Sequence, residues 1–168
     1  MPASRRNRRA GLRRYSRLTG APMLYSILKA AHVLAIVLWV GGMLFAHAFL
    51  RPALAGLDPP QRLSLMHAVL ARFFAAVTGA IVVVLSSGLA MFAMAGARPP
   101  WDWTAMTLVG LVMMAIFAVI RLRLFPPLRV AVQARDWPAG AAALARIRQA
   151  VATNLALGLA VIALTVAF

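Results

Sequence analysis

Four long apolar stretches dominate the chain, and the segments before and between them carry most of its charged residues. The stretches cover residues 24–50, 73–95, 103–124 and 147–168. Each reaches the roughly 20 apolar residues that a helix needs to cross the hydrocarbon core of a bilayer. Because the runs are continuous, they exclude a membrane β-barrel, whose strands alternate over about ten residues. The pattern predicts an all-α fold, an integral membrane bundle of four helices joined by short loops.

The segments between the stretches carry residues that start and end helices. Asp58-Pro59-Pro60 predicts a helix start, with the Asp as N-cap and a proline as the first helical residue. A helix from there to Ala95 would be about 55 Å long, so its first turns should extend beyond the apolar core. Pro126-Pro127 predicts an end or a kink in the third helix. The basic segment 129–148 is interpreted as a connector in which Asp136-Trp137-Pro138 can start the last helix.

Composition and charge narrow the class of protein. Only 12% of the 168 residues are charged, against about a quarter in a soluble domain, and the mean hydropathy is +0.85. These values exclude an ordinary cytosolic globule and a disordered chain. The net charge of +15 suggests a nucleic acid partner. However, the basic residues lie between apolar runs too long for a soluble basic domain, so we expect no nucleic acid partner.

The residue types that are missing exclude several kinds of chemistry. The chain has no Cys, which excludes disulfides, thiolate metal sites and a cysteine nucleophile. It has no Glu, and Asp58, Asp102 and Asp136 all fall at expected helix starts, where capping accounts for them. There is no nucleotide loop, Ser–His–Asp set or pair of carboxylates. A non-enzymatic role is therefore favoured over a catalytic one, although the sequence leaves the choice open.

The first 22 residues hold seven Arg, and we expect a disordered tail ahead of a four-helix domain over residues 23–168. The arginines of this tail also decide which membrane orientation the positive-inside rule predicts. Counted over the whole chain, nine cationic residues flank the helices on each side, so the positive-inside rule gives no answer. If the chain starts at Met23, the count becomes nine against two. The side that holds segments 51–72 and 121–148 is then cytoplasmic, and we favour this interpretation.

The histidines are the first candidates for a functional site, because an ionisable group in hydrocarbon is costly and by default functional. His32 is a candidate ligand or proton relay, and the alternative is a buried imidazole hydrogen-bonded to a neighbouring helix. His47 lies 15 residues later, about 22 Å along the helix axis, so the two cannot bind one metal ion. His67 is expected at the depth of His47. That pair could ligate haem iron or copper, or His67 could simply face water at the interface.

Several methionines stand at helical spacings from the histidines. One precedes His47 by four residues and should share its helix face, and three others are expected near the depth of His32. A site of imidazole nitrogen and thioether sulfur suits Cu(I). The alternative is ordinary packing, because Met fills gaps in apolar interiors. The candidate metal ligands are therefore His32, His47, Met43, Met91, Met94 and Met106.

Arginines near His47 could bind an anion. Arg51 and Arg72 stand at the two ends of the loop nearest this histidine. They could hold a haem propionate or another anion by charge-assisted hydrogen bonds. We expect most arginines of the basic connector to bind anionic lipid headgroups of the bilayer.

Polar and small residues inside the apolar stretches are assigned to packing. We expect Asn154 to make an interhelical hydrogen bond, and Ser86 and Ser87 to bond back to their own helix. Small residues, among them Gly41, Gly42, Gly79 and Gly158, allow close helix contact.

Several segments resemble a known family. Leu28-Lys29-Ala30-Ala31-His32-Val33-Leu34-Ala35, followed by Trp39-Val40-Gly41-Gly42-Met43, resembles the opening helix of the copper-resistance protein D (CopD) family. Later segments resemble its small single-domain members, for example Leu50-Arg51-Pro52-Ala53, Arg72-Phe73-Phe74 and Asn154-Leu155-x-Leu157-Gly158. The resemblance implies a multi-pass protein of the bacterial inner membrane that handles or takes up copper.

The first stretch also resembles the HemJ-type protoporphyrinogen oxidases, four-helix membrane proteins that use haem b. That resemblance matches His32 to their first-helix histidine and implies an axial haem ligand. After Gly42 this chain reads Met-Leu-Phe-Ala-His and departs from those enzymes. Three functions stay open: copper handling through His and Met, a haem b redox protein, and a structural membrane subunit without a metal. A homo-oligomer is left open as the assembly.

Overall fold

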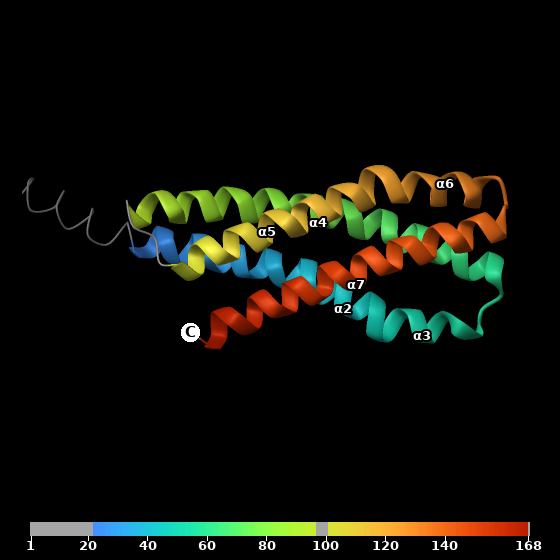
Figure 1. Cartoon of the computed structure of the whole chain (residues 1–168), viewed down its shortest axis with the longest axis horizontal. Coiled ribbons are helices and arrows are strands. Elements are labelled where there is room, and N and C mark those ends of the chain that lie inside the picture. Colours follow the sequence, from blue (N-terminus) through green and yellow to red (C-terminus); the bar gives the residue numbers. More distant parts are fainter. Residues whose placement is uncertain (1–21, 97–100, 168) are drawn as a thin grey trace, which may run out of the picture.

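The computed structural model describes residues 22–96 and 101–167, and these residues form helices and no strand. Four helical segments are long and apolar enough to cross a membrane: Pro22–Gly56, Pro59–Ala95, Trp103–Gln133 and Trp137–Thr165. They run back and forth along the long axis of the molecule (Figure 1). The prediction of an all-α bundle of four membrane-spanning helices is confirmed. Residues 1–21 of the expected Arg-rich tail lie outside the described residues.

The first helical segment, Pro22–Gly56, is not a uniform α-helix. After the α-helical residues 22–36 come two π-helical turns, η1 (Val37–Gly41) and η2 (Ala46–Leu50), with the short α2 (Gly42–Phe45) between them. The segment ends with α3 (Arg51–Ala53) and a 3-10 turn, η3 (Leu54–Gly56). Because a π-helical turn bonds residue i to i+5, the i, i+4 spacing of an α-helix does not predict faces across it.

The second helix, α4 (Pro59–Ala95), begins and ends where the sequence predicts. The carbonyl of Asp58 accepts the first helical hydrogen bond, from the backbone N–H of Arg62 at 2.9 Å. The side chain of Asp58 makes no capping hydrogen bond, so its expected side-chain cap is wrong. A proline at the first helical position, with its preset φ, starts the helix instead. At the other end Gly96 has a φ of 80°, which glycine adopts without a steric penalty.

The third helical segment continues through Pro126 and Pro127. It consists of α5 (Trp101–Val119), the π-helical η4 (Ile120–Leu124) and α6 (Phe125–Gln133). The prolines fall in the first turn of α6, directly after the π-helical turn, where the change of hydrogen-bond register accommodates residues without an N–H. The expectation that the helix could end at these prolines is therefore wrong.

The connection to the fourth helix is much shorter than the expected basic connector. Only residues 134–136 are non-helical, since α7 (Trp137–Ala167) starts directly afterwards. Arg135 adopts a left-handed φ of 56°, and the N–H of Asp136 donates to the carbonyl of Ala131 at 2.9 Å, as in a Schellman turn. The Oδ1 of Asp136 accepts from the N–H of Ala139 at 3.0 Å. This bond confirms Asp136 as the residue that starts the last helix.

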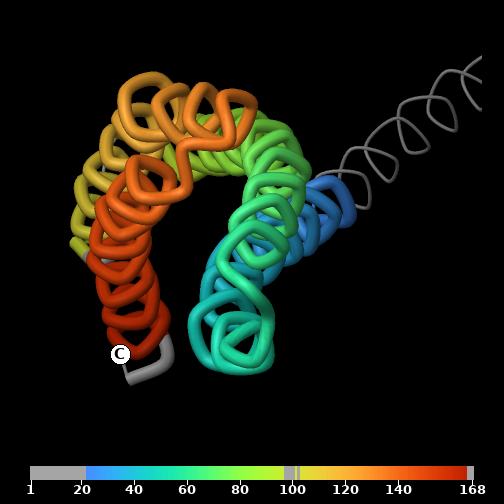
Figure 2. The backbone as a smooth tube through the Cα atoms, turned by 90° about the vertical axis from the view of Figure 1, so that its right-hand side faces the viewer, coloured from blue at the N-terminus to red at the C-terminus, as the bar shows by residue number. Residues whose placement is uncertain are grey.

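Seen along its long axis, the bundle forms an arch (Figure 2). The first segment, α4, α5 with α6, and α7 follow one another around it, so α7 and the first segment are its two ends. The arch is closed where α7, which packs along α5 and α6, also contacts η1 and α2. Aromatic rings fill the core: Phe74 of α4 lies edge-on to Phe117 of α5 and Phe125 of α6, at 5.9 and 5.2 Å between ring centroids.

The outer surface of the bundle is apolar. Leu34, Leu89 and Leu122, from three different segments, are 68%, 75% and 69% exposed, as expected for side chains that face lipid. Since lipid tails are as apolar as leucine, close packing rather than the hydrophobic effect holds such helices together. Gly158 of α7 provides one such close approach: a Cβ built on it would lie 2.9 Å from Val40 Cγ2.

Candidate functional site

A cavity of about 360 Å³ lies at the end of the bundle that holds the α3–α4 and α6–α7 turns. The first segment and α7 form its walls, and α4 forms its floor. In Figure 1 it falls between α3 and the first half of α7, at the right of the view. Its size is within the range of about 300–1,000 Å³ that is usual for small-molecule sites.

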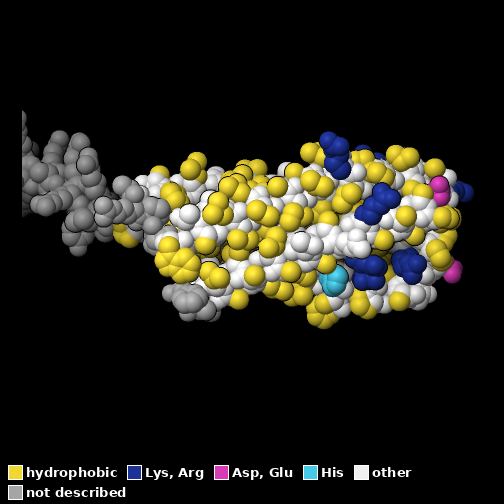
Figure 3. All heavy atoms as spheres, viewed as in Figure 1, with side chains coloured by type: hydrophobic (Ala, Val, Ile, Leu, Met, Phe, Trp, Pro, Cys, Tyr) yellow, Lys and Arg dark blue, Asp and Glu magenta, His cyan; other side chains and the backbone are white. Residues whose placement is uncertain are grey.

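Three arginines from three helices surround the outer part of the cavity; we name them the outer layer. Arg51 belongs to α3, Arg62 to the first turns of α4 and Arg148 to α7. No Asp or Glu is among the residues that line the cavity. Figure 3 shows Lys or Arg side chains gathered next to a histidine on this face of the molecule. The outer layer therefore favours a negatively charged ligand.

The lining changes character one helical turn further into the molecule. On each helix the residue one turn inward from the arginine also lines the cavity: His47 on the first segment, Met66 on α4 and Val151 on α7. At 1.5 Å per residue these positions are about 4.5–6 Å further along their helices than the arginines. We name His47 and Met66 the inner layer, because they bring one imidazole and one thioether from two helices to the same cavity.

The structure brings together only part of the predicted site. His47 and Arg51 line the cavity, whereas Arg72 is exposed and is not among the lining residues. Met43, expected beside His47, is only 2% exposed and belongs to the apolar core. Met43 therefore packs in the core and does not line the cavity with His47.

Three lining residues were missed by reasoning from the sequence: Arg62, Met66 and Arg148. A signal for two of them exists. Arg62 and Met66 are four residues apart on α4, which mirrors the spacing of His47 and Arg51 on the first segment. Nothing comparable marks Arg148, because Arg146 stands two residues earlier on the same helix and the sequence does not say which of the two faces inward.

His67 lies outside this cavity and packs against the third segment. Its ring stacks on Phe125 at 5.3 Å between centroids and 4° between planes. The guanidinium groups of Arg121 and Arg129 each lie 5.6 Å from the centroid of the same phenylalanine ring. The Nε2 of His67 is buried without a hydrogen-bond partner. His67 follows Met66 by one residue, about 100° around α4, which explains why only the methionine lines the cavity.

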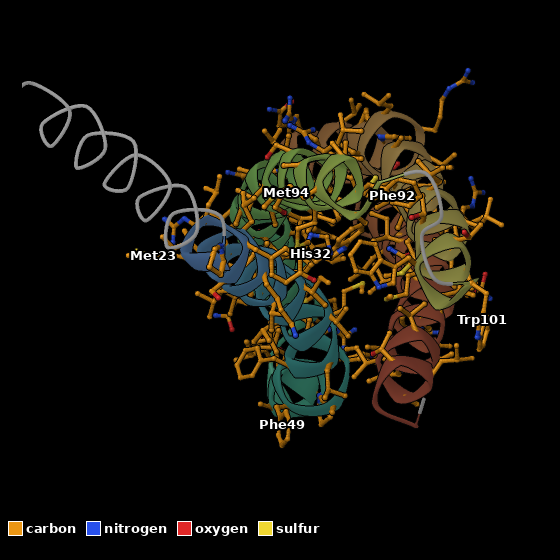
Figure 4. The ribbon with its side chains drawn as sticks, turned by 90° about the vertical axis from the view of Figure 1, so that its left-hand side faces the viewer. Met23, His32, Phe49, Phe92, Met94 and Trp101 are labelled. Atoms are coloured by element: carbon orange, nitrogen blue, oxygen red, sulfur yellow. The ribbon has the colours of Figure 1, made fainter. Side chains whose placement is uncertain are left out.

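His32 lies towards the opposite end of the bundle, on the inner side of the first segment next to α4 (Figure 4). Its Nδ1 is 2.9 Å from the Oγ of Ser87, a buried residue of α4. The Ser87 hydroxyl also lies within hydrogen-bond distance of the carbonyls of Val83 and Val84, and when it donates to one of them it can accept from an Nδ1–H of His32. In a neutral imidazole this arrangement leaves Nε2 without a proton, the form that binds metals. A Cβ on Gly88 would lie 3.3 Å from His32 Cε1, so the glycine makes room for the ring.

The methionines predicted near His32 have different environments. Met94 is 43% exposed, whereas Met91 and Met106 are partly buried. Within residues 22–96 and 101–167, no group of three or more His, Asp or Glu is placed to hold a metal ion. A metal ion bound to histidine in this part of the chain would therefore need other ligands, such as the methionine of the inner layer.

Residues 67–168 match the family model described as CopD, Copper resistance protein D. The match covers more than half of the chain. The chain belongs to the CopD family. With four helices able to span a bilayer, this CopD protein is a multi-pass membrane protein related to copper resistance. No curated protein and no solved structure matches the chain significantly.

The match to the CopD family covers one wall of the cavity. The matched range includes α7 with Arg148, and the part of α4 from His67 onward. The first segment, with His47 and Arg51, precedes that range. The cavity of this CopD protein therefore combines a wall inside the matched range with a wall outside it.

Proposed function

We propose that this CopD protein handles copper and binds Cu(I) as its cargo in the inner layer, between His47 and Met66. The supporting observation is that one imidazole and one thioether, from two different helices, line the same cavity in a member of this family. Imidazole suits copper, and thioether selects Cu(I). The proposal includes a role in copper transport or resistance and a location in the bacterial inner membrane.

The charge of the outer layer favours the monovalent ion. The Coulomb energy between an ion and the three arginines scales with the charge of the ion, so repulsion of Cu²⁺ is twice that of Cu⁺. Neutral imidazole and thioether bring no negative charge that would offset the larger repulsion. The walls beside the inner layer are apolar, with Leu70 and Val151, and this favours a weakly hydrated, soft ion over a strongly hydrated one.

The test is a Cu(I) titration of the full chain, purified in a neutral detergent, against a chromophoric chelator. His47→Ala and Met66→Leu should each lower the affinity for Cu(I) by about tenfold or more, since even the loss of a group that only orients a ligand costs about 10- to 100-fold. Met114→Leu is the matched control, because Met114 of α5 packs against the apolar core and does not line the cavity. If a double variant at His47 and Met66 keeps the affinity of the wild type, the proposal is wrong.

A second candidate, a haem b redox protein of the HemJ type, is supported by the contact between His32 and Ser87. A neutral imidazole held at Nδ1 by Ser87 presents an unprotonated Nε2, as an axial haem ligand must. The haem would supply the electron transfer. A visible spectrum of the purified protein distinguishes the candidates: a Soret band that is lost in His32→Ala supports haem, and stoichiometric copper without that band supports the first proposal. Neither copper nor haem would favour a structural subunit.

A further inference from the structure

The outer layer and the apolar residues of the same cavity form an amphiphilic site that can take a ligand other than copper. We propose that the cavity binds one anionic phospholipid, with the headgroup phosphate on Arg51, Arg62 and Arg148 and an acyl chain along the apolar wall. This inference does not depend on copper binding, because it needs neither His47 nor Met66.

Charge complementarity identifies the headgroup. Three arginines converge from three helices, and no carboxylate is among the residues that line the cavity with them. Guanidinium groups bind phosphate through paired, charge-assisted hydrogen bonds. An anion in the outer layer would also offset the repulsion between the three like charges.

The depth of the arginines fits a membrane headgroup. Arg51 is the first residue after the apolar run that ends at Leu50, and Arg148 lies where the last apolar run begins. Such positions fall at the boundary between hydrocarbon and headgroups, where lipid phosphates are found. A phosphate of the bilayer would therefore be at the level of the outer layer without leaving its leaflet.

The apolar wall favours a lipid over free inorganic phosphate. Beside the arginines, the cavity is lined by Leu63 and Leu70 of α4 and by Leu144, Ile147 and Val151 of α7. An inorganic anion gains nothing from such a surface, whereas an acyl chain packs against it. The cavity is bounded by α7 on one side and the first segment on the other, so a chain can lie along their common groove.

The test measures lipid binding to the full chain in neutral detergent, without copper, by native mass spectrometry. Phosphatidylglycerol, phosphatidylcholine and inorganic phosphate are the three ligands. We expect phosphatidylglycerol to bind more tightly than phosphatidylcholine. Arg51→Gln or Arg148→Gln should weaken phosphatidylglycerol binding about fivefold each, and the double variant about 30-fold. Arg146→Gln is the matched control, since it is exposed on the same helix as Arg148 and does not line the cavity.

Three results would overturn the inference. The first is equal binding of the two lipids, and the second is an equal loss in Arg146→Gln and Arg148→Gln. The third is displacement of phosphatidylglycerol by millimolar phosphate, which would identify an anion site without a lipid. Ala145→Phe gives an independent check, because the larger side chain narrows the cavity beside its apolar wall and leaves the three arginines in place. It should weaken lipid binding as strongly as the loss of one arginine. Cu(I) affinity is measured in the same neutral detergent. A loss of lipid binding can then be told apart from a loss of copper binding.

Discussion

Replacing Gly158 with Ala tests how closely α7 approaches the first segment, and with it the distance between the two walls of the cavity. The new Cβ would lie 2.9 Å from Val40 Cγ2 and 3.1 Å from Met113 Cε. Carbon atoms in contact prefer about 3.5–4.0 Å, so Val40 or the helix must move by about 0.6 Å or more. Met113 can move away at little cost, whereas the β-branched Val40 is stiff in a helix and only 4% exposed.

The expected magnitude is a difference between two opposing effects. Added methylene groups in a well-packed interior cost about 1–3 kcal/mol, and Ala in place of Gly in a helix returns about 1 kcal/mol. Gly158→Ala should therefore lower the free energy of unfolding by about 1 kcal/mol. Gly110→Ala is the control: nothing lies within 4 Å of a Cβ there, so the variant should be more stable by up to about 1 kcal/mol.

The assay is unfolding of the full chain by dodecyl sulfate in mixed micelles, followed by tryptophan fluorescence. Trp39 reports directly, because its ring lies edge-on to Phe117 at 6.1 Å between centroids in the core. The two variants should differ by about 2 kcal/mol, with opposite signs relative to the wild type. Equal shifts for both variants would refute the close approach of α7 to the first segment.

Other predictions concern the hairpin turn, His32 and the aromatic core. Arg135→Gly should stabilise the protein by about 1 kcal/mol in thermal unfolding, because a left-handed φ of 56° is strained for a residue with a Cβ; a lower stability would contradict this turn. Ser87→Ala should shift the ¹⁵N spectrum of His32 from the Nδ1–H form to a mixture of tautomers and cost about 0.6 kcal/mol, whereas an unchanged spectrum would argue against the hydrogen bond. Phe125→Leu removes the stack on His67 and two cation–π contacts and should cost about 2–4 kcal/mol in the same unfolding assay; a cost under about 1 kcal/mol would contradict their importance.

The helices could be predicted from the sequence because their determinants are local. An apolar run long enough for the bilayer identifies a spanning helix whatever surrounds it. The same holds for the start of α4 after Asp58 and of α7 after Asp136, which depend on residues within one turn. The passage of the third segment through Pro126-Pro127 was not predictable in this way, because a π-helical turn before the prolines decides it.

The candidate site was only partly predictable, because it is assembled from three helices. Which side of each helix faces the cavity depends on rotation about its axis and on the neighbouring helices, so the sequence does not show that Met43 packs in the core while His47 lines the cavity. Met66 was not recognised, since only the packing of α4 against the first segment and α7 brings it to the same cavity as His47. Burial of Met43 in the core and of Ser87 beside His32 likewise follows from neighbouring helices.

The two walls of the cavity are the earliest and the latest synthesised of the four helices. A nascent chain that has inserted only the first three has His47, Arg51, Arg62 and Met66 in place, but no Arg148 to complete the cluster. Capture of an anion by all three arginines would therefore require the last helix to have entered the bilayer and packed. Occupancy of the arginine cluster would then report the completion of membrane assembly, and a translation product arrested before α7 should be unable to hold such an anion.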